Sequence, residues 1–134
     1  MQTRHRFLMF STLAFFCIAL AGTNLSREIP EGIVKSLAVG NSRELSRHFN
    51  ETIELVVLTS EDVYSKSQAE LILRSFFSEN RPVKFELLHT GGKESSRYAI
   101  GNMKTEKGEF RVYFLLKHRE SVPLIHLLRI EPVQ

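Results

Sequence analysis

The second half of the sequence alternates apolar and polar residues in four segments that are separated by short turns. The segments span residues 83–90, 97–104, 109–118 and 123–131. Side chains of a β-strand point alternately to the two faces of a sheet, so this period of two indicates strands. Because the turns are short, the segments predict a four-stranded antiparallel meander. A segment rich in β-branched residues at 52–59 predicts a fifth strand earlier in the chain.

Two helical pieces are predicted before the meander. Pro30 is typical of a first helical turn and Gly40 of a helix end, so the first helix is expected over residues 30–39. A short capped turn that starts at Asn41 follows it.

The second helix is the clearest element, and we predict it over residues 68–78. Ser67 and Glu70 have the spacing of a capping box at its start. Its apolar face consists of Ala69, Ile72, Leu73, Phe76 and Phe77. Helices that precede a run of strands predict an α+β domain, with N-terminal helices packed on a curved antiparallel sheet of about five strands.

The N-terminal residues 1–21 have the pattern of a signal peptide. A basic start at Arg4 and Arg6 is followed by an apolar run that ends in small residues at Ala19 and Ala21. The run is shorter than the about 20 apolar residues that span a bilayer. We therefore predict a signal peptide over 1–21, a leader over 22–29 and a single domain over 30–134, with an uncleaved N-terminal anchor as an alternative.

The predicted mature chain is close to neutral. Removing Arg4 and Arg6 from the 18 basic residues leaves 16 against 15 acidic ones, a net charge of +1. So small a charge argues against a nucleic acid as partner. The single cysteine, Cys17, lies inside the apolar run, so the mature domain has no disulfide; lipid attachment there is the less favoured alternative because Phe16 precedes it. These features predict export to a bacterial periplasm or medium.

The predicted sheet has apolar residues on both faces. One face covers the helices through residues such as Phe85, Leu87 and Phe114, and no element remains to cover the other. A soluble monomer rarely exposes such a patch. We therefore predict a homodimer or an envelope protein partner on the second face. The residues expected there are Leu88, Met103, Tyr113, Leu115 and Leu127, together with Ala99.

The order of elements is similar to the cone-shaped fold of the nuclear transport factor 2-like (cystatin-like) superfamily. Residues 62–70, then Leu73 and Phe76-Phe77, and finally residues 128–131 resemble a more specific group. That group is a family of small exported proteins of unknown function from Bacteroidetes-type bacteria. The resemblance covers about residues 29–131 and implies the fold but no activity.

The sequence lacks the motifs of the common catalytic sites. It has no Gly-x-Ser-x-Gly elbow, no phosphate loop and no closely spaced histidine pair for a metal, and no cofactor is indicated. A non-catalytic binding or assembly module is therefore the favoured function. The alternative is a protein that binds or isomerises a small apolar ligand in the cone. Its candidate ligand-binding residues are Tyr64, His89, Tyr98, Asn102 and His126.

Overall fold

The computed structural model describes residues 29–134. The predicted signal peptide, Cys17 and the leader up to residue 28 lie outside the described residues. The chain forms three helices, α1 (Glu31–Val39), α2 (Ser42–Ser46) and α3 (Lys66–Glu79). Gly40 ends α1 with a φ of 70°, a left-handed conformation that glycine adopts without strain.

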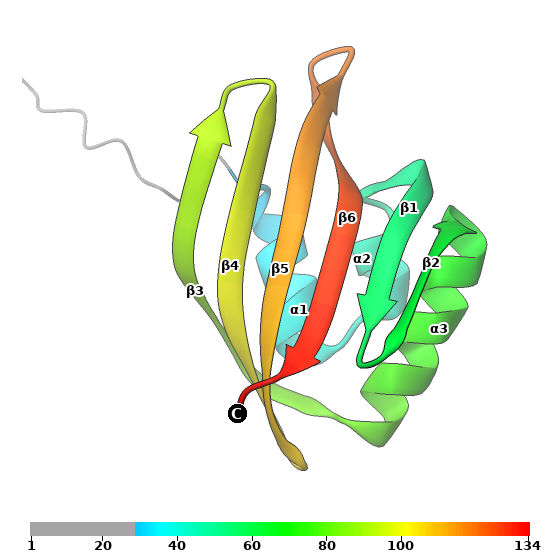
Figure 1. Ribbon diagram of the computed structural model, residues 1–134, viewed down its shortest axis with the longest axis vertical. Coiled ribbons are helices and arrows are strands. Elements are labelled where there is room, and N and C mark those ends of the chain that lie inside the picture. The colour runs from blue at the N-terminus through cyan, green and yellow to red at the C-terminus, as the bar shows by residue number, and fades with distance from the viewer. Residues whose placement is uncertain (1–28) are drawn as a thin grey trace, which may run out of the picture.

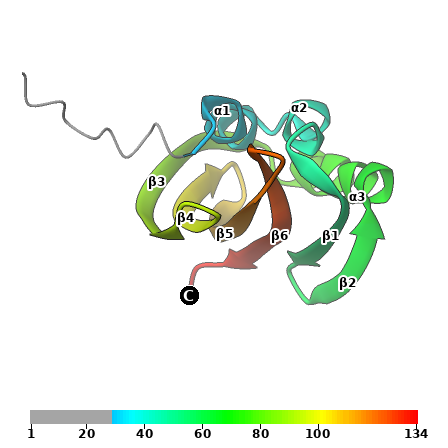
Figure 2. The same cartoon turned by 90° about the horizontal axis from the view of Figure 1, so that it is seen from above.

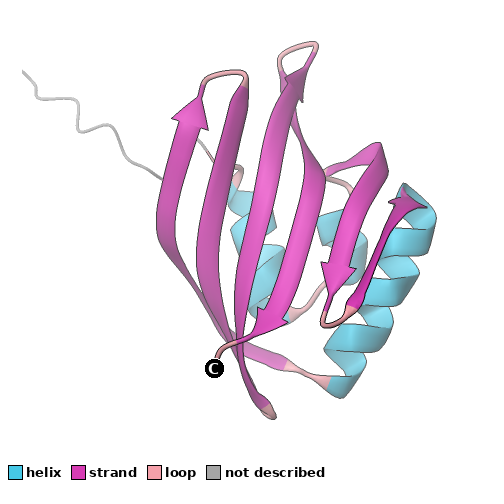
Figure 3. Cartoon of the chain, in the orientation of Figure 1, coloured by secondary structure: helices cyan, strands magenta, loops and turns pink. Residues whose placement is uncertain are grey.

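Six strands form one open sheet in the order β2-β1-β6-β5-β4-β3 (Figures 1 and 3). The strands are β1 (Phe49–Val57), β2 (Ser60–Ser65), β3 (Pro82–Lys93), β4 (Ser96–Thr105), β5 (Gly108–Arg119) and β6 (Val122–Pro132). Strands β3 to β6 form the predicted antiparallel meander. Strand β1 pairs with β6 in parallel, so the sheet is mixed.

The predicted α+β class and the helix-covered sheet are confirmed, but the sheet has one more strand than expected. The sequence of β2, SEDVYS, has no alternation of apolar and polar residues, and its residues are more typical of turns and helix caps. Four of its six residues are exposed, and it is held by its antiparallel pairing with β1. A strand at the edge of a sheet that buries almost nothing leaves little hydrophobic pattern in the sequence.

All three helices lie on one side of the sheet, and the core fills the space between the layers (Figure 2). The largest side chains there, including Phe49, Leu73, Phe114 and Leu116, are exposed by 2% or less. Ile29, the first described residue, is also 1% exposed and belongs to the core. The interior that could have been a ligand pocket is therefore packed with apolar side chains.

The start of α3 differs by two residues from the predicted one. Ser65 is the N-cap, and its hydroxyl accepts a hydrogen bond from the backbone N–H of Gln68 at 3.2 Å. The Gln68 side chain in turn accepts from the backbone N–H of Ser65 at 3.3 Å, which completes a capping box. The predicted pair, Ser67 and Glu70, has the same serine-x-x-acceptor spacing two residues later, so spacing alone does not distinguish the two.

The β4–β5 hairpin corrects the predicted face of two residues. Its turn consists of Glu106 and Lys107, which places Met103 opposite Phe110 and Ala99 opposite Phe114. Residues opposite each other in an antiparallel pair point to the same side of the sheet. Ala99 and Met103 therefore lie in the core and are 0% exposed, and the prediction that they line the second face is wrong.

Candidate functional site

The sheet surface that points away from the helices, called the outer face here, has no element of the described chain packed over it. Figure 1 looks onto this face. The pairing register arranges its side chains in rows across the strands, which we name after their residues on β5. The Tyr113 row contains Glu61, Val56, Arg129, Tyr113, Ile100 and His89. The Leu115 row contains Val63, Glu54, Leu127, Leu115, Tyr98 and Gly91.

Two further rows border these on either side. The Arg111 row contains Glu131, Arg111, Asn102 and Glu86. The Lys117 row contains Leu124, Lys117, Ser96 and Lys93. The charged rows thus flank an apolar and aromatic centre, which is the composition of a protein–protein interface with a polar rim.

Apolar side chains occupy the centre of the outer face. Leu127, Leu115 and Ile100 are partly exposed, although they lie on the interior strands β6, β5 and β4. Val63, on the edge strand β2, is 62% exposed. A contiguous apolar surface of this kind on a soluble domain marks an interaction site more often than a chance feature. Of the predicted interface residues, Tyr113, Leu115 and Leu127 therefore lie together on this face.

Leu88 lies in a different environment from the other predicted interface residues. It is the unpaired residue of an irregularity in β3, because Leu87 pairs with Gly101 and His89 pairs with Ile100. Its side chain is 51% exposed at the edge of the sheet. Leu88 is therefore an exposed edge residue, separate from the apolar centre.

An aromatic cluster lies next to the apolar centre. Tyr98 stacks on Tyr113, with ring centroids 6.0 Å apart and planes 22° apart. The Tyr98 hydroxyl lies 3.1 Å from Nε2 of His89, so the two side chains form a hydrogen bond. Gly91 makes room for this arrangement, since a Cβ on residue 91 would lie 2.5 Å from the Tyr98 hydroxyl. The cluster presents a rigid aromatic surface, which is typical of residues that dominate binding energy.

The predicted ligand-binding residues do not converge in the cone. Tyr64 is on the helix side of β2 and packs against the core. His89, Tyr98 and Asn102 lie on the opposite, outer face of the sheet. The expectation that these groups share one interior is wrong, because the β4–β5 register turns Tyr98 and Asn102 away from the helices.

His126 occupies an irregular position in β6, between Ile125, which pairs with Leu116, and Leu127, which pairs with Leu115. Its Nε2 atom is buried and has no hydrogen-bond partner among the described residues. Burial lowers the pKa of His126, and the positive charges of Lys117 and Arg119 lower it further. The neutral imidazole is therefore favoured in the folded chain.

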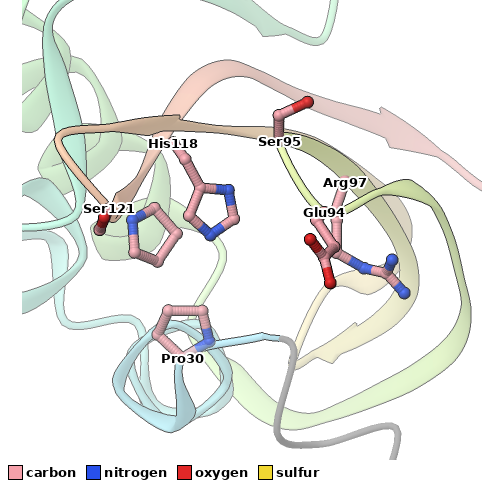
Figure 4. Close-up of a pocket in the computed structure, with 7 residues that line it drawn as sticks. Pro30, Glu94, Ser95, Arg97, His118 and Ser121 are labelled. Carbon is pink, nitrogen blue, oxygen red and sulfur yellow. The ribbon is translucent and has the colours of Figure 1, made fainter.

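The structure also forms an open groove where the β3–β4 and β5–β6 turns approach the start of α1. The groove has a volume of about 590 Å³ and includes Pro30, Glu94, Arg97, His118 and Ser121 in its lining. Figure 4 shows His118 and Glu94 on opposite sides of it. The backbone N–H of His118 donates to the Ser95 carbonyl at 3.1 Å, which joins the end of β5 to the β3–β4 turn. Sequence reasoning missed this groove, because it depends on which turns meet at one end of the sheet.

The described residues include no cluster of three or more His, Cys, Asp or Glu side chains suited to a metal ion. None of the helices between residues 29 and 134 is both long and apolar enough to cross a membrane.

The fold and the surface define the class of the protein. Helices packed on one face of an open, curved sheet form an α+β domain of the cystatin-like type. A domain of unknown function with a cystatin-like fold from Nostoc punctiforme shares this architecture, with a TM-score of 0.62 and 8% identity over 77% of this chain and 72% of that chain.

The particular family follows from the sequence itself. The family model "Domain of unknown function (DUF4783)" matches residues 30–131, so the chain belongs to this family. A family member from Bacteroides ovatus is 32% identical, with a TM-score of 0.76, and the match covers 80% of this chain and 97% of that chain. One from Bacteroides fragilis is also 32% identical, with a TM-score of 0.75 and coverage of 78% and 99%.

None of the curated proteins matches the chain. The family matches confirm the resemblance inferred from residues 62–70 and the C-terminal strand, and with it a family of unknown function.

Proposed function

We propose that the protein is a non-catalytic assembly module of the bacterial cell envelope that pairs with a second copy of itself through the outer face. The observation that carries this proposal is the uncovered row of Leu127, Leu115 and Tyr98 in the middle of the sheet. These side chains are partly exposed, so covering them removes further apolar surface from water and favours association.

The chemistry of the interior supports a binding role over a catalytic one. The space between the helices and the sheet is filled by Phe49, Phe114, Met103 and other side chains that are 2% exposed or less. An acid–base site would require a pair of polar groups in a cavity. Tyr64 and His89, two of the predicted ligand-binding residues, point to opposite sides of the sheet.

A second copy fits the outer face because the charges on the face complement one another. Strands β1 and β2 contribute the acidic Glu54 and Glu61, whereas β5 contributes the basic Arg111 and Lys117. The outer face therefore carries charges of both signs, which a second copy of the same face can pair.

The oligomeric state tests the proposal. The exported protein is expected to sediment as a dimer, and Leu115→Glu is expected to convert it to a monomer with unchanged circular dichroism. Leu71→Glu is the matched control, since Leu71 is 58% exposed on α3, on the other side of the molecule. A wild-type protein that stays monomeric at its highest soluble concentration would overturn the proposal. Binding of a different envelope protein to the outer face of a monomeric chain would overturn it as well.

The envelope location is proposed from the predicted signal peptide over residues 1–21. Fractionation of expressing cells tests it, together with N-terminal sequencing of the product. A protein that begins at Gly22 in the periplasm or medium is the expected result. A cytoplasmic protein that retains Met1 would contradict it.

A further inference from the structure

The two central strands of the outer face bring complementary residues together in three rows. Across β5 and β6, Tyr113 lies opposite Arg129, Leu115 opposite Leu127, and Arg111 opposite Glu131. Figure 1 shows that these two strands form the middle of the sheet. Each of these three rows therefore offers one residue on β6 and a chemically complementary one on β5.

We propose that the second copy docks with its two-fold axis parallel to the strands, between β5 and β6. This inference rests on the proposed function and specifies how the same face is used. A two-fold rotation about such an axis leaves each row at the same position along the strands. It places the β2-β1-β6 half of one sheet over the β5-β4-β3 half of the other. Strand β6 of one copy then lies over β5 of the other. Face-to-face sheets pack with nearly aligned strands, at an angle of about 30°.

The central contacts of this arrangement are favourable in three of the four rows; in the Lys117 row, Leu124 lies over the partner's Lys117. Leu127 packs on the partner's Leu115 in one row, and the Arg129 guanidinium lies over the ring of the partner's Tyr113 in the next. Arginine on an aromatic ring gains a cation–π attraction that grows when water is excluded. In the third row, Glu131 meets the partner's Arg111. Within one chain Glu131 already lies 3.6 Å from Arg129, so the two basic groups would share one carboxylate.

The flanking strands are complementary in the same arrangement. Strand β1 lies over the partner's β4, which places the partner's Ile100 over Val56, whose side chain is 5% exposed. The same overlap brings the Glu54 carboxylate to the hydroxyl of the partner's Tyr98. Strand β2 lies over the partner's β3, which brings Glu61 to the partner's His89. Each exposed carboxylate thus faces one of the two hydrogen-bonded side chains of the aromatic cluster.

The other face-to-face arrangement has its two-fold axis perpendicular to the strands. It would pair Tyr113 with the partner's Leu115 and Glu86 with the partner's Lys93, but its contacts at the centre of the sheet are poorer. It would exchange the Tyr113 and Leu115 rows, so that Arg129 would lie on the partner's Leu127 and Glu54 on the partner's Val56. It would also place Arg111 against the partner's Lys117. Charges buried without a partner and like charges across an interface both disfavour association. The register of the outer face therefore selects the axis parallel to the strands.

Charge reversal distinguishes the two arrangements. Arg111→Glu and Glu131→Arg, made separately, would each place like charges together twice in the proposed dimer. We expect each to weaken dimerisation at least about tenfold, as measured by sedimentation equilibrium. An equimolar mixture of the two variants is expected to form a heterodimer, because residues 111 and 131 are then both acidic in one chain and both basic in the other. Lys107→Glu, in the exposed β4–β5 turn, is the matched control.

The outcomes separate this inference from the proposed function. If the wild type dimerises and Leu115→Glu prevents it, but Arg111→Glu strengthens the dimer, the perpendicular axis is correct and this inference fails alone. Reversals without effect on a Leu115-dependent dimer also overturn it. A monomeric wild type overturns both. Thermal unfolding of each variant shows whether a loss of pairing reflects an unfolded monomer.

Discussion

The ring of Phe85 lies directly against the backbone of Gly101, on the helix side of the sheet. Phe85 pairs with Met103 two residues along the neighbouring strand, so its ring folds back over β4 to reach residue 101. A Cβ at residue 101 would overlap with this ring. The glycine therefore determines how β3 packs on the core.

Gly101→Ala is accordingly expected to destabilise the domain by about 1–3 kcal/mol, the usual effect of overfilling a packed core. Urea unfolding monitored by circular dichroism measures the change. The double variant Gly101→Ala with Phe85→Leu provides the control, because a smaller side chain at residue 85 should relieve the overlap. The expected double-variant loss is smaller than the sum of the two single losses. A strictly additive result would show that the two residues are independent.

Leu73 and Leu71 offer a matched pair on α3. Leu73 is 0% exposed and Leu71 is 58% exposed, although they lie two residues apart on the same helix. Leu73→Ala is expected to lower the free energy of unfolding by about 2–5 kcal/mol, because it leaves a cavity in the core. Leu71→Ala should change it by no more than about 0.5 kcal/mol. Equal effects in a urea titration would mean that α3 packs by a different face.

The capping box of α3 gives a second comparison within one element. Ser65→Ala removes the hydroxyl that accepts the N–H of Gln68 and is expected to cost about 1 kcal/mol. Ser67→Ala removes a hydroxyl whose contact is with Ser65, at 3.3 Å, and is expected to have a smaller effect. Both variants are compared by thermal unfolding. A larger loss for Ser67→Ala would favour the helix start that spacing alone predicts.

Periodicity predicts the elements of this fold well, because burial on one face leaves a strong pattern. The helix around Leu73 and the meander that contains Phe114 are examples. The pattern does not specify which residues oppose each other. The predicted face of Met103 is wrong because its placement depends on a two-residue turn at Glu106-Lys107, and neither residue is a typical turn former.

The sequence predicts that the sheet has an uncovered apolar face, but it does not predict the contacts between side chains on that face. An uncovered apolar face follows from counting elements, and the sequence-based placement of Tyr113, Leu115 and Leu127 on it agrees with the register. The contact between His89 and Tyr98 is not predictable, because it depends on an irregularity in β3 at Leu88. Such irregularities change the register by one residue, which moves every following side chain to the other face.

The two histidines with lowered pKa values predict how stability depends on pH. Burial lowers the pKa of His48, where the positive charge of Lys66 acts in the same direction and Glu44 opposes it. Burial also lowers the pKa of His126. An unfolded histidine titrates near pH 6.5, so below about that pH the unfolded chain takes up protons that the folded chain does not. Stability should therefore be complete above about pH 6.5 and fall as the pH drops towards the folded pKa values.

Urea unfolding across this pH range measures the effect, with NMR titration of each imidazole as the direct readout. His126→Gln and His48→Gln are each expected to reduce the loss of stability at acidic pH, and the double variant to reduce it most. Lys117→Gln gives a finer test, since removing that positive charge should raise the pKa of His126 and leave His48 unaffected. Stability that rises on acidification, or variants that retain the full wild-type slope, would contradict the assignment of the neutral imidazole to the folded state.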